Sequence, residues 1–413
     1  MVSILSLPPE LLSSVFSELP GVDLARIALV CQQFHAATKI ESVWQRRCFE
    51  EYNFTSDQLK GWPEESYRTV YTKVLHPYGH ILGTWQPQMG PYGGLVSIRV
   101  QDGMLVAIQY LPPVDPKVCL PLRSRQLFHI RINEDKQTIV ECLKGPNGPH
   151  KLQVLPGNGD AESEDNFSVL CSKPDKHRLF ESRQEELQNW IREEVGLEGH
   201  ANLQHNFPNM HDHHIELLRI KYIILNQYDS SCLFKRLPTP VDNSDVPFKA
   251  GFFKGTYGGH GIEIVSVTYQ DNKLLGTKIT GDPNVPARQL SIEAHLDEPM
   301  ILTKTQQETL GNIEGLQKDD VLVKDPKLLA HSQSFAVPYG VHDRGMGEVA
   351  SQIGLQLDRC KRRYFATGLI AMHGFRNSSR TPCHLVVFSE DVFALLWLEL
   401  HSISWFHRVT ELL

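Results

Sequence analysis

The sequence predicts an α+β fold: a small N-terminal three-helix module, then a large antiparallel β-barrel-like domain with a few helices. Between Leu11 and Phe34, the apolar positions recur at helical spacing. From His80 onward, short β-branched runs alternate with glycine and proline turns, which is typical of many short antiparallel strands. At 413 residues and 41% apolar residues, the chain is long enough to bury substantial cores.

Three short helices are expected in the first fifty residues. Two prolines, Pro8 and Pro9, fix the backbone before the first helix, and Pro20-Gly21 ends it. Asp23 is well placed to cap a second helix, and a third lies around Trp44. The apolar stripes of the first two helices are Leu11, Leu12, Val15, Phe16 and Leu19, and then Leu24, Ile27, Ala28, Cys31 and Phe34. Because three short helices cannot bury this surface among themselves, a partner or a following domain must cover part of it.

These helices carry an ordered motif. It reads Leu7-Pro8-x-Glu10-Leu11-Leu12, Phe16, Leu19-Pro20, Asp23-Leu24, Val30-Cys31, Phe34 and Trp44-x-x-Arg47-Cys48. In this order the motif resembles an F-box, which implies docking on the adaptor Skp1 and, through it, on a cullin–RING ubiquitin ligase. The residues that the resemblance assigns to Skp1 binding are Leu7, Pro8, Leu11, Leu12, Val15, Phe16, Leu19, Leu24, Val30, Cys31, Phe34 and Trp44. The alternative is a helical cap that packs only on the following domain, and the ordered match favours the F-box.

We expect an F-box over residues 1–50, a helical connector over 51–79 and the β-barrel-like domain over 80–413. Strands are predicted at Leu95–Val100, Leu105–Tyr110, Leu127–Ile132, Ile262–Tyr269, Leu369–Met372 and Leu385–Phe388. An amphipathic helix is predicted at Arg183–Glu194, and a second helical run, apolar enough to be half-buried, at Ile215–Leu225. Residues 303–334 are polar with scattered leucines, so we expect a partly disordered insertion there.

Glycines and aromatic residues cluster where strands are expected to begin, at Gly83–Leu95 and at Lys254–Ile262. Glycine in a strand pattern marks a bend or a close backbone approach, so these stretches predict barrel corners and also the mouth of a pocket. After another predicted strand, the loop Thr277–Ala287 offers Lys278, Thr280, Asp282 and Asn284, polar groups suited to holding a polar chain end. The alternative for this loop is an ordinary turn in which Asp282 and Asn284 bond their own backbone. The predicted substrate-binding residues are Trp85, Tyr92, Tyr257, His260, Lys278, Asp282, Asn284, His373 and Phe375.

Four residues have the chemistry of a structural zinc site: Cys142, His150, Cys171 and His177. Thiolate and imidazole are preferred Zn²⁺ ligands, and the turn residues Gly145–Pro149 can return His150 towards Cys142. Such a site would fasten the excursion 142–177 and would not be catalytic. The alternative is two core cysteines and two surface histidines, and the spacing alone leaves both open. A second histidine group is interpreted as solvated loop: His200, His205, His211, His213 and His214.

Composition excludes several classes of function. The net charge of −7 gives no global support for nucleic-acid binding. No signal-peptide pattern and no apolar run of membrane-spanning length are found, and we expect eight free or metal-bound cysteines in a reducing compartment. We expect a cytoplasmic location, with nuclear or centrosomal location left open. Common catalytic motifs are absent from the sequence, so we expect no enzyme activity.

Further stretches extend the resemblance over nearly the whole chain. They are His80–Leu95, Lys254–Gly261, Gly276–Asn284, Thr367–Ala371 with His373–Phe375, and Trp397–Leu400. They are similar to one family of F-box proteins, which implies a β-barrel-like substrate domain that receives C-terminal ends of client proteins, cyclin D1 among them. The resemblance also implies zinc at Cys142, His150, Cys171 and His177. Against that family, the chain begins almost at the F-box and the stretch from Met300 to Phe335 is shorter.

The predicted function is therefore the substrate-recognition subunit of an SCF-type ubiquitin ligase, which marks clients for degradation. One alternative is a lipocalin-like barrel that binds small apolar ligands in a closed cavity. Another is a zinc hydrolase, which would need an open metal position and a general base.

Overall fold

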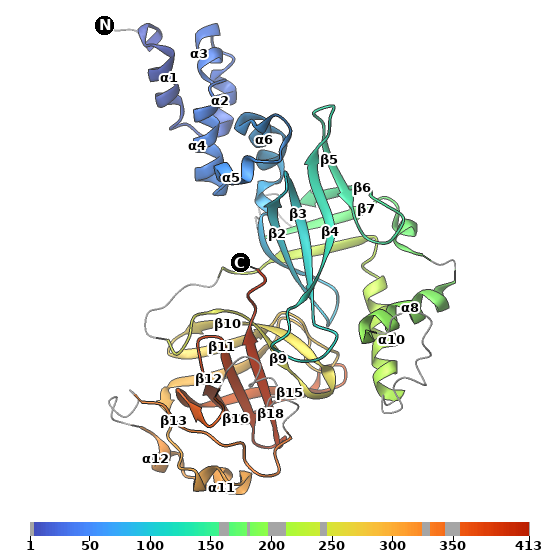
Figure 1. Ribbon diagram of the computed structural model, residues 1–413, viewed down its shortest axis with the longest axis vertical. Coiled ribbons are helices and arrows are strands. Elements are labelled where there is room, and N and C mark those ends of the chain that lie inside the picture. Colours follow the sequence, from blue (N-terminus) through green and yellow to red (C-terminus); the bar gives the residue numbers. More distant parts are fainter. Residues whose placement is uncertain are drawn as a thin grey trace. The chain divides into compact units, whose positions relative to one another are not determined.

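The computed structural model describes residues 4–156, 165–179, 182–196, 212–239, 246–323, 331–342 and 356–412. The chain divides into two compact units. The first comprises Met1–Trp85, Ser97–Ile108 and Gln126–Leu179, and the second comprises Gln86–Val96, Gln109–Arg125 and Phe180–Leu413. N-terminal helices followed by antiparallel barrels confirm the predicted α+β class (Figure 1).

The N-terminal module consists of α1 (Pro9–Phe16), α2 (Gly21–Ile27), α3 (Gln32–Ala37) and α4 (Glu41–Tyr52). Proline occupies the first turn of α1, as expected. The prediction of Asp23 as a cap is wrong, because Pro20 is the N-cap of α2 and Asp23 lies in its first turn. The single helix predicted across Leu24 and Phe34 is also wrong. Backbone bonds from Leu29 and Val30 to carbonyls three residues back tighten the end of α2, and Cys31 is extended.

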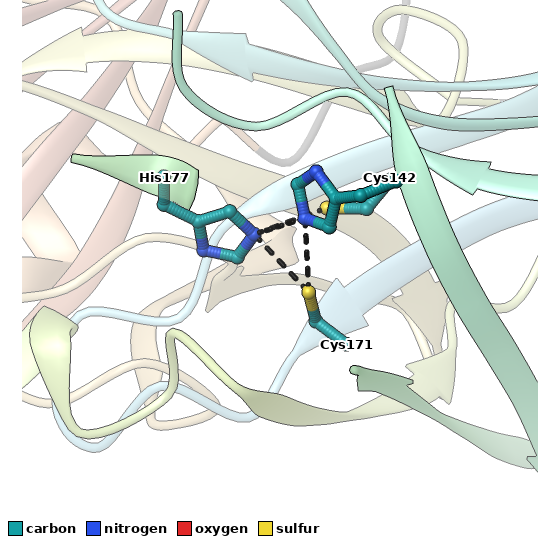
Figure 2. A group of neighbouring side chains, drawn as sticks. Cys142, Cys171 and His177 are labelled. Atoms are coloured by element: carbon teal, nitrogen blue, oxygen red, sulfur yellow. Dashed lines mark hydrogen bonds between the residues drawn. The ribbon is translucent and has the colours of Figure 1, made fainter. Parts of the chain in front are cut away.

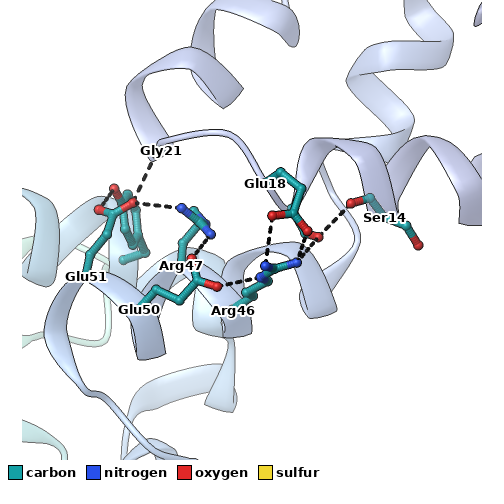
Figure 3. Close-up of polar contacts among 9 residues, drawn as sticks. Ser14, Glu18, Gly21, Arg46, Arg47, Glu50 and Glu51 are labelled. Carbon is teal, nitrogen blue, oxygen red and sulfur yellow. Dashed lines mark hydrogen bonds and ion pairs between the residues drawn. The ribbon is translucent and has the colours of Figure 1, made fainter.

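This break brings Phe34 onto Phe16, with ring centroids 5.0 Å apart in an edge-to-face arrangement. Polar contacts complete the module. Arg46 of α4 pairs with Glu18, which follows α1, and with Glu50 one turn further along α4 (Figure 3). Glu51 accepts a hydrogen bond from Tyr71, which belongs to the connector. The module and the connector are therefore joined by both apolar and polar contacts.

The connector is helical but irregular. Its helices are α5 (Ser56–Leu59), α6 (Tyr67–Val70), the π-helical turn η3 (Tyr71–Leu75) and α7 (His76–Tyr78). Ser66 caps α6 by accepting a hydrogen bond from the Thr69 backbone. Tyr71 packs against Trp44 of α4, with ring centroids 5.1 Å apart.

The first closed barrel contains eight strands in sequence order. They are β1 (Gly83–Pro87), β2 (Leu95–Gln101), β3 (Met104–Leu111), β4 (Arg123–Ile132), β5 (Thr138–Cys142), β6 (His150–Pro156), β7 (Asn166–Cys171) and β8 (Ser231–Arg236). β5 pairs with β4 over five residue pairs, and β6 with β7 over five, whereas β5 and β6 share two. β5 diverges from β6 and β7 in Figure 1.

The second closed barrel has the strand order β10-β11-β12-β15-β16-β17-β18-β9. Its strands are β9 (Gly251–Thr256), β10 (Ile262–Gln270), β11 (Lys273–Lys278), β12 (Leu290–Pro299), β15 (Arg362–Met372), β16 (Arg376–Val387), β17 (Val392–Trp397) and β18 (Ser402–Arg408). A stack of Phe248, Phe393 and Phe406 lies in one of its apolar clusters. The sequence pattern indicated a barrel but not that there are two.

Much of the stretch predicted as a partly disordered insertion is folded. Residues 303–323 contain the helices α11 (Leu310–Glu314) and α12 (Lys318–Val321), and β13 (Gln333–Ser334) pairs with β14 (Arg359–Cys360). Leu310, Ile313 and Val321 are buried in one apolar cluster with Trp405 of β18. Residues 324–330 lie outside the described residues.

Two further helices, α8 (Arg183–Val195) and α10 (Asp212–Asn226), match the predicted helical segments and lie side by side (Figure 1). Trp190 of α8 packs on Tyr222 of α10, with centroids 5.5 Å apart. The histidine group interpreted as solvated loop lies outside the described residues, except for the backbone of His213 and His214 in α10. No helix in the described ranges is both long and apolar enough to span a bilayer.

Candidate functional site

The N-terminal module exposes an unusual amount of apolar surface. Among the described residues, half of the exposed large apolar side chains lie in the first fifty residues: Ile4, Leu5, Leu11, Val15, Val22, Leu29, Val30 and Phe49, against eight in all later residues. A soluble module would normally bury such side chains, so their exposure marks a binding surface.

The structure divides the twelve residues predicted to bind Skp1 by exposure. Pro8, Leu11, Val15 and Val30 are exposed, Leu7, Leu19, Cys31 and Phe34 are half-buried, and Leu12, Phe16, Leu24 and Trp44 are buried. The buried four build the core of the module. Sequence reasoning missed Leu29, which is 87% exposed and lies in the break between α2 and α3. The sequence analysis predicted one continuous helix from Leu24 to Phe34, and in that helix Leu29 lies outside the apolar stripe.

The four predicted metal ligands come together. Cys142 ends β5, His150 begins β6, Cys171 ends β7 and His177 ends the short helix that follows. Their ligand atoms all lie within 4.8 Å of one another. The Nε2 of His150 lies 3.0 Å from the Cys171 Sγ and 2.9 Å from the His177 Nε2, and the Cys142 Sγ lies 3.3 Å from the same His177 atom. Figure 2 shows Cys142, Cys171 and His177 pointing toward one another.

The loop between β5 and β6 is built to hold this arrangement. Gly145 has φ +78°, and a Cβ there would lie 2.3 Å from the His177 Cα. Asn147 donates to the backbone carbonyls of Lys176 and Arg178, which fastens the His177 turn. The Nδ1 of His150 faces the Gly148 carbonyl at 3.2 Å, so its Nε2 is the atom left for a metal. Burial raises the pKa of the Cys142 thiol to about 11.

Two thiols and two imidazoles converging on one buried point fit a tetrahedral Zn²⁺. Bond lengths of about 2.0–2.3 Å to zinc place neighbouring ligand atoms about 3.5 Å apart, close to the separations found. With four protein ligands, no coordination position would remain for substrate or water, so the arrangement suits a structural metal and not a catalytic one.

A second candidate site is a cavity of about 150 Å³ that lies wholly in the second unit. It is lined by the segment from Met89 to Gly94, the end of β3, one face of α10 and the residues that flank β10 and follow β11. Three predicted substrate-binding residues line it: Tyr92, His260 and Asp282. The sequence analysis missed Glu263, Gln109 and the α10 residues Leu217, Leu218, Lys221 and Leu225. For Glu263 there was a signal, since one carboxylate interrupts the otherwise apolar run Ile262 to Val265.

A buried ion-pair cluster adjoins this cavity: Glu263 and Asp282 line the cavity, whereas Lys278 and Tyr257 do not. The Lys278 Nζ lies 2.5 Å from the Glu263 Oε2 and 3.0 Å from the Asp282 Oδ2, and it sits 4.5 Å from the centre of the Tyr257 ring. Burial raises the pKa of Glu263 to about 8 despite the nearby lysine. Burial also works to raise the pKa of Asp282, but the charge of Lys278 outweighs it and the pKa is lowered. The cluster therefore holds one cation between two carboxylates of different acidity.

Asp282 also forms the turn that was kept as an alternative. Its Oδ1 accepts hydrogen bonds from the backbone of Asn284 at 2.6 Å and of Val285 at 3.1 Å. The tip of the β15–β16 hairpin joins this turn, since Gly374 and Phe375 donate to the Pro283 carbonyl. His373 and Phe375 thus lie next to the turn, although neither lines the cavity.

The glycine-rich segment Gly90–Leu95 approaches the same loop closely. Gly93 forms a bridge with Thr280, and the backbone of Gly281 donates to the Tyr92 carbonyl at 3.0 Å. Gly93 has φ +58°, and a Cβ there would lie 2.4 Å from the Ile279 carbonyl oxygen. The prediction that this glycine permits a close backbone approach agrees with this geometry.

Trp85 is placed differently from the other predicted residues. It is fully buried, its Nε1 donates to the Ile81 carbonyl at 2.7 Å, and its ring packs edge-on against Phe167 at 4.6 Å. Trp85 therefore belongs to the core of the first unit and has no surface for a ligand.

The cavity is not the apolar interior that a lipocalin-like binder requires, because Lys221, Glu263 and Asp282 line it. Neither does the metal cluster leave the open position that a zinc hydrolase requires.

Two protein-family models match this chain, one in its N-terminal region and one in its C-terminal region. Residues 4–50 match the F-box-like family model, and residues 234–411 match the model described as the cyclin D1 binding domain. The second match includes His260, Glu263, Thr280 and Asp282 of the cavity.

Full-length relatives agree with these matches. The chain is 37% identical to F-box only protein 31 of Rattus norvegicus, over 98% of this chain and 85% of the relative. It is 36% identical to F-box only protein 31 of Homo sapiens, over 98% of this chain and 83% of the relative. Identity to F-box only protein 31-B of Xenopus laevis is 35%, over 99% of this chain and 84% of the relative. The chain therefore belongs to the F-box only protein 31 family.

Proposed function

We propose that this protein is the substrate-recognition subunit of an SCF-type ubiquitin ligase. The F-box-like match supports binding to Skp1, and through Skp1 to a cullin–RING ligase. The concentration of exposed apolar side chains in the same residues is the observation that carries this proposal. In this role the protein performs no chemistry of its own. It holds a client's lysines near the ubiquitin-conjugating enzyme, so that proximity accelerates transfer.

Co-purification with Skp1 tests the first step. Leu11→Glu with Val30→Glu changes two exposed side chains and leaves the buried core of the module intact. We expect wild type to form a stable complex and the double variant to lose more than about 2 kcal/mol of binding free energy. Leu400→Glu, an exposed leucine in the second unit, is the matched control and should bind Skp1 like wild type. A wild-type chain that ignores Skp1 contradicts the proposal.

We further propose that the cavity beside the Lys278 cluster receives the C-terminal end of a client, as in a cyclin D1-like protein. The match to the cyclin D1 binding domain covers four of its polar residues, His260, Glu263, Thr280 and Asp282. Its small volume favours the end of a chain over a continuous segment. Its lining combines apolar side chains of α10, Leu217 and Leu218, with the polar residues Thr280 and His260, a combination that suits recognition of one side chain together with a polar terminus.

Peptides test this assignment directly. A fluorescent peptide with the C-terminal sequence of cyclin D1 should bind, and the same peptide extended by two residues should bind at least about tenfold more weakly, because the added residues exceed the small volume of the cavity. His260→Ala, which removes a cavity wall, should weaken binding, whereas Met372→Ala, exposed and outside the cavity, should not. Equal affinity for the native and extended peptides would contradict recognition of chain ends.

For the metal cluster we propose a structural Zn²⁺ bound by Cys142, His150, Cys171 and His177. The buried donor set and its convergence support this. The metal would fasten three strand ends and the following turn.

A further inference from the structure

The gap between β5 and β6 has the features of a peptide-binding groove, and no part of the proposed function uses it. The two strands pair at Cys142 with His150 and at Glu141 with Lys151, and the pairing ends there. Continuing the register would set Val140 opposite Leu152 and Thr138 opposite Val154, but within the described residues these are not paired. A groove opens instead, lined by residues Thr138–Glu141 of β5, Lys151–Leu155 of β6 and Tyr78. We call this the β5–β6 groove, and its volume is about 660 Å³.

The direction of the backbone groups along both edges follows from two hydrogen bonds. Ser172 donates to the Lys151 carbonyl, so the polar backbone groups of Lys151 point towards β7. The backbone N–H of Leu143 donates to the Leu127 carbonyl, so the polar backbone groups of Leu143 point towards β4. In an antiparallel strand the direction alternates with each residue. Leu152 and Val154 of β6 therefore direct their N–H and C=O groups into the groove.

The same alternation applies to β5. Val140 and Thr138 direct their N–H and C=O groups into the groove, while Ile139 faces the neighbouring strand β4 and pairs with Arg131. Two strand edges with unpaired backbone groups thus face each other across an open space. Such edges are templates for an added strand, because each exposed donor and acceptor gains a partner.

Side chains specify what kind of strand fits. Among the lining residues, Val140, Leu152 and Val154 lie on one face of the strands, whereas Ile139, Glu141 and Lys151 alternate onto the other face. The groove ends where Glu141 pairs with Lys151, and we call this its closed end. There the Glu141 Oε2 lies 2.9 Å from the His129 Nε2 and 2.9 Å from the Arg131 Nε. The exposed Lys151, in contrast, forms no ion pair with any acidic group among the described residues. The closed end is therefore left with an uncompensated positive charge, which an acidic side chain on the occupant would balance.

We propose that the β5–β6 groove binds an extended segment of a partner protein by strand addition. The segment pairs antiparallel with β6, the longer edge, which points its C-terminal part towards the closed end. It carries apolar residues at alternate positions and an aspartate or glutamate near Lys151. This partner segment is distinct from a client C-terminus in the cavity of the second unit, so failure of either proposal leaves the other standing.

Hydrogen–deuterium exchange on the free full-length protein tests the groove itself. The amides of Val140, Leu152 and Val154 should exchange fast, whereas the alternate amides of Ile139 and Gln153, which face paired strands, should exchange slowly. Uniformly slow exchange in dilute protein would mean that the groove is already covered by this chain, and would overturn the proposal. Protection that appears only when the protein is concentrated would identify a second copy as the occupant and would also overturn it.

A designed peptide tests the occupant. The probe alternates threonine and valine over eight residues, starting with threonine, and has an aspartate in place of threonine at its seventh position, on the face of Lys151. It carries a fluorophore on its C-terminal end so that no free terminal carboxylate is present. Binding should protect the amides of Leu152 and Val154. Lys151→Glu should weaken binding of this probe roughly two- to fivefold and strengthen binding of the same probe with lysine at that position. If wild type and Lys151→Glu bind the aspartate probe and the lysine probe with the same affinities, Lys151 does not select the occupant. Absence of amide protection on binding would overturn strand addition.

Discussion

Cys142 and His150 are direct partners in the register of β5 and β6, and the same two residues supply two of the four ligand atoms of the metal cluster. Of the two residue pairs that join these strands, the one next to the β5–β6 loop is thus also one side of the metal site. A metal at this position would hold β5 and β6 together where their hydrogen bonding ends.

Replacement of a ligand should abolish metal binding. We expect one Zn²⁺ per wild-type chain and an affinity at least about 100-fold lower in Cys142→Ser, because loss of a direct ligand costs more than loss of a group that only supports one. Metal content by mass spectrometry of the native protein, with competition against a chelator, measures this. Cys383→Ser is the control, since Cys383 is buried in the second barrel and far from any of the four ligands in the sequence. Equal zinc content in both variants would contradict the assignment.

Zinc uptake should also depend on pH. Because burial raises the pKa of Cys142 to about 11, this thiol is protonated at neutral pH in the absence of metal. Zn²⁺ binds the thiolate, so binding must release protons. We expect apparent zinc affinity to fall as the pH is lowered from 8 to 6, measured by chelator competition at each pH. An affinity independent of pH would exclude thiol ligands.

Loss of the buried lysine should destabilise the second barrel strongly. Lys278→Met leaves the ionised Asp282 buried without its cation and Glu263 without its partner, which costs about 3–5 kcal/mol in the free energy of unfolding. Lys273 lies on the same strand and pairs with Glu293 at 2.9 Å, but its side chain is 41% exposed, so Lys273→Met should cost less than about 1 kcal/mol. Urea unfolding of the two variants compares a buried and an exposed pair directly. If both variants lose a similar free energy of unfolding, burial of the Lys278 ion pairs does not increase their contribution to stability.

The sequence identified the architecture better than its details. Helical spacing in the first fifty residues and strand patterns after His80 predicted the fold class, because both signals come from local periodicity. The break between α2 and α3 was missed because Leu29, Val30 and Cys31 continue an apolar pattern that tertiary packing interrupts. The number of barrels depends on long-range strand pairing, such as that of β18 with β9, for which the chain carries no local signal.

The two candidate sites differ in how far the sequence alone could predict them. Cysteine and histidine are the residue types that zinc prefers, so the four candidates could be named from residue type, but the spacing left an alternative open and only the structure brings their ligand atoms within 4.8 Å of one another. The cavity depends on α10, which is far in sequence from the loop at Asp282, and an amphipathic pattern does not reveal what a helix faces. Trp85 shows the opposite error, since an aromatic residue beside glycines is compatible with both a pocket and a core.

The stability of the second unit should depend on Glu263 between pH 5 and 8. Burial raises its pKa to about 8 in the folded protein, whereas an unfolded glutamate titrates near 4.5. Over this range the folded state binds a proton that the unfolded state has lost, so stability is highest below the unfolded pKa and falls as the pH approaches 8. Glu263→Gln keeps a neutral side chain at every pH, so its free energy of unfolding should fall less between pH 5 and 8 than that of wild type. Parallel curves would mean that Glu263 is ionised throughout.

A pair of glycines separates backbone strain from close packing. Gly93 and Gly258 both have φ +58°, so alanine at either position costs about 1–2 kcal/mol for the left-handed backbone. At Gly258 no atom lies within 4 Å of an added Cβ, whereas at Gly93 the Cβ would lie 2.4 Å from the Ile279 oxygen and 2.6 Å from the Ala287 Cβ. Gly93→Ala should therefore cost more than Gly258→Ala in urea unfolding. It should also weaken binding of the client peptide, because Gly93 lines the cavity and holds its wall against the loop at Thr280. Equal effects of the two variants on stability would mean that the segment around Gly93 can move away without loss, and that the cavity does not depend on this approach.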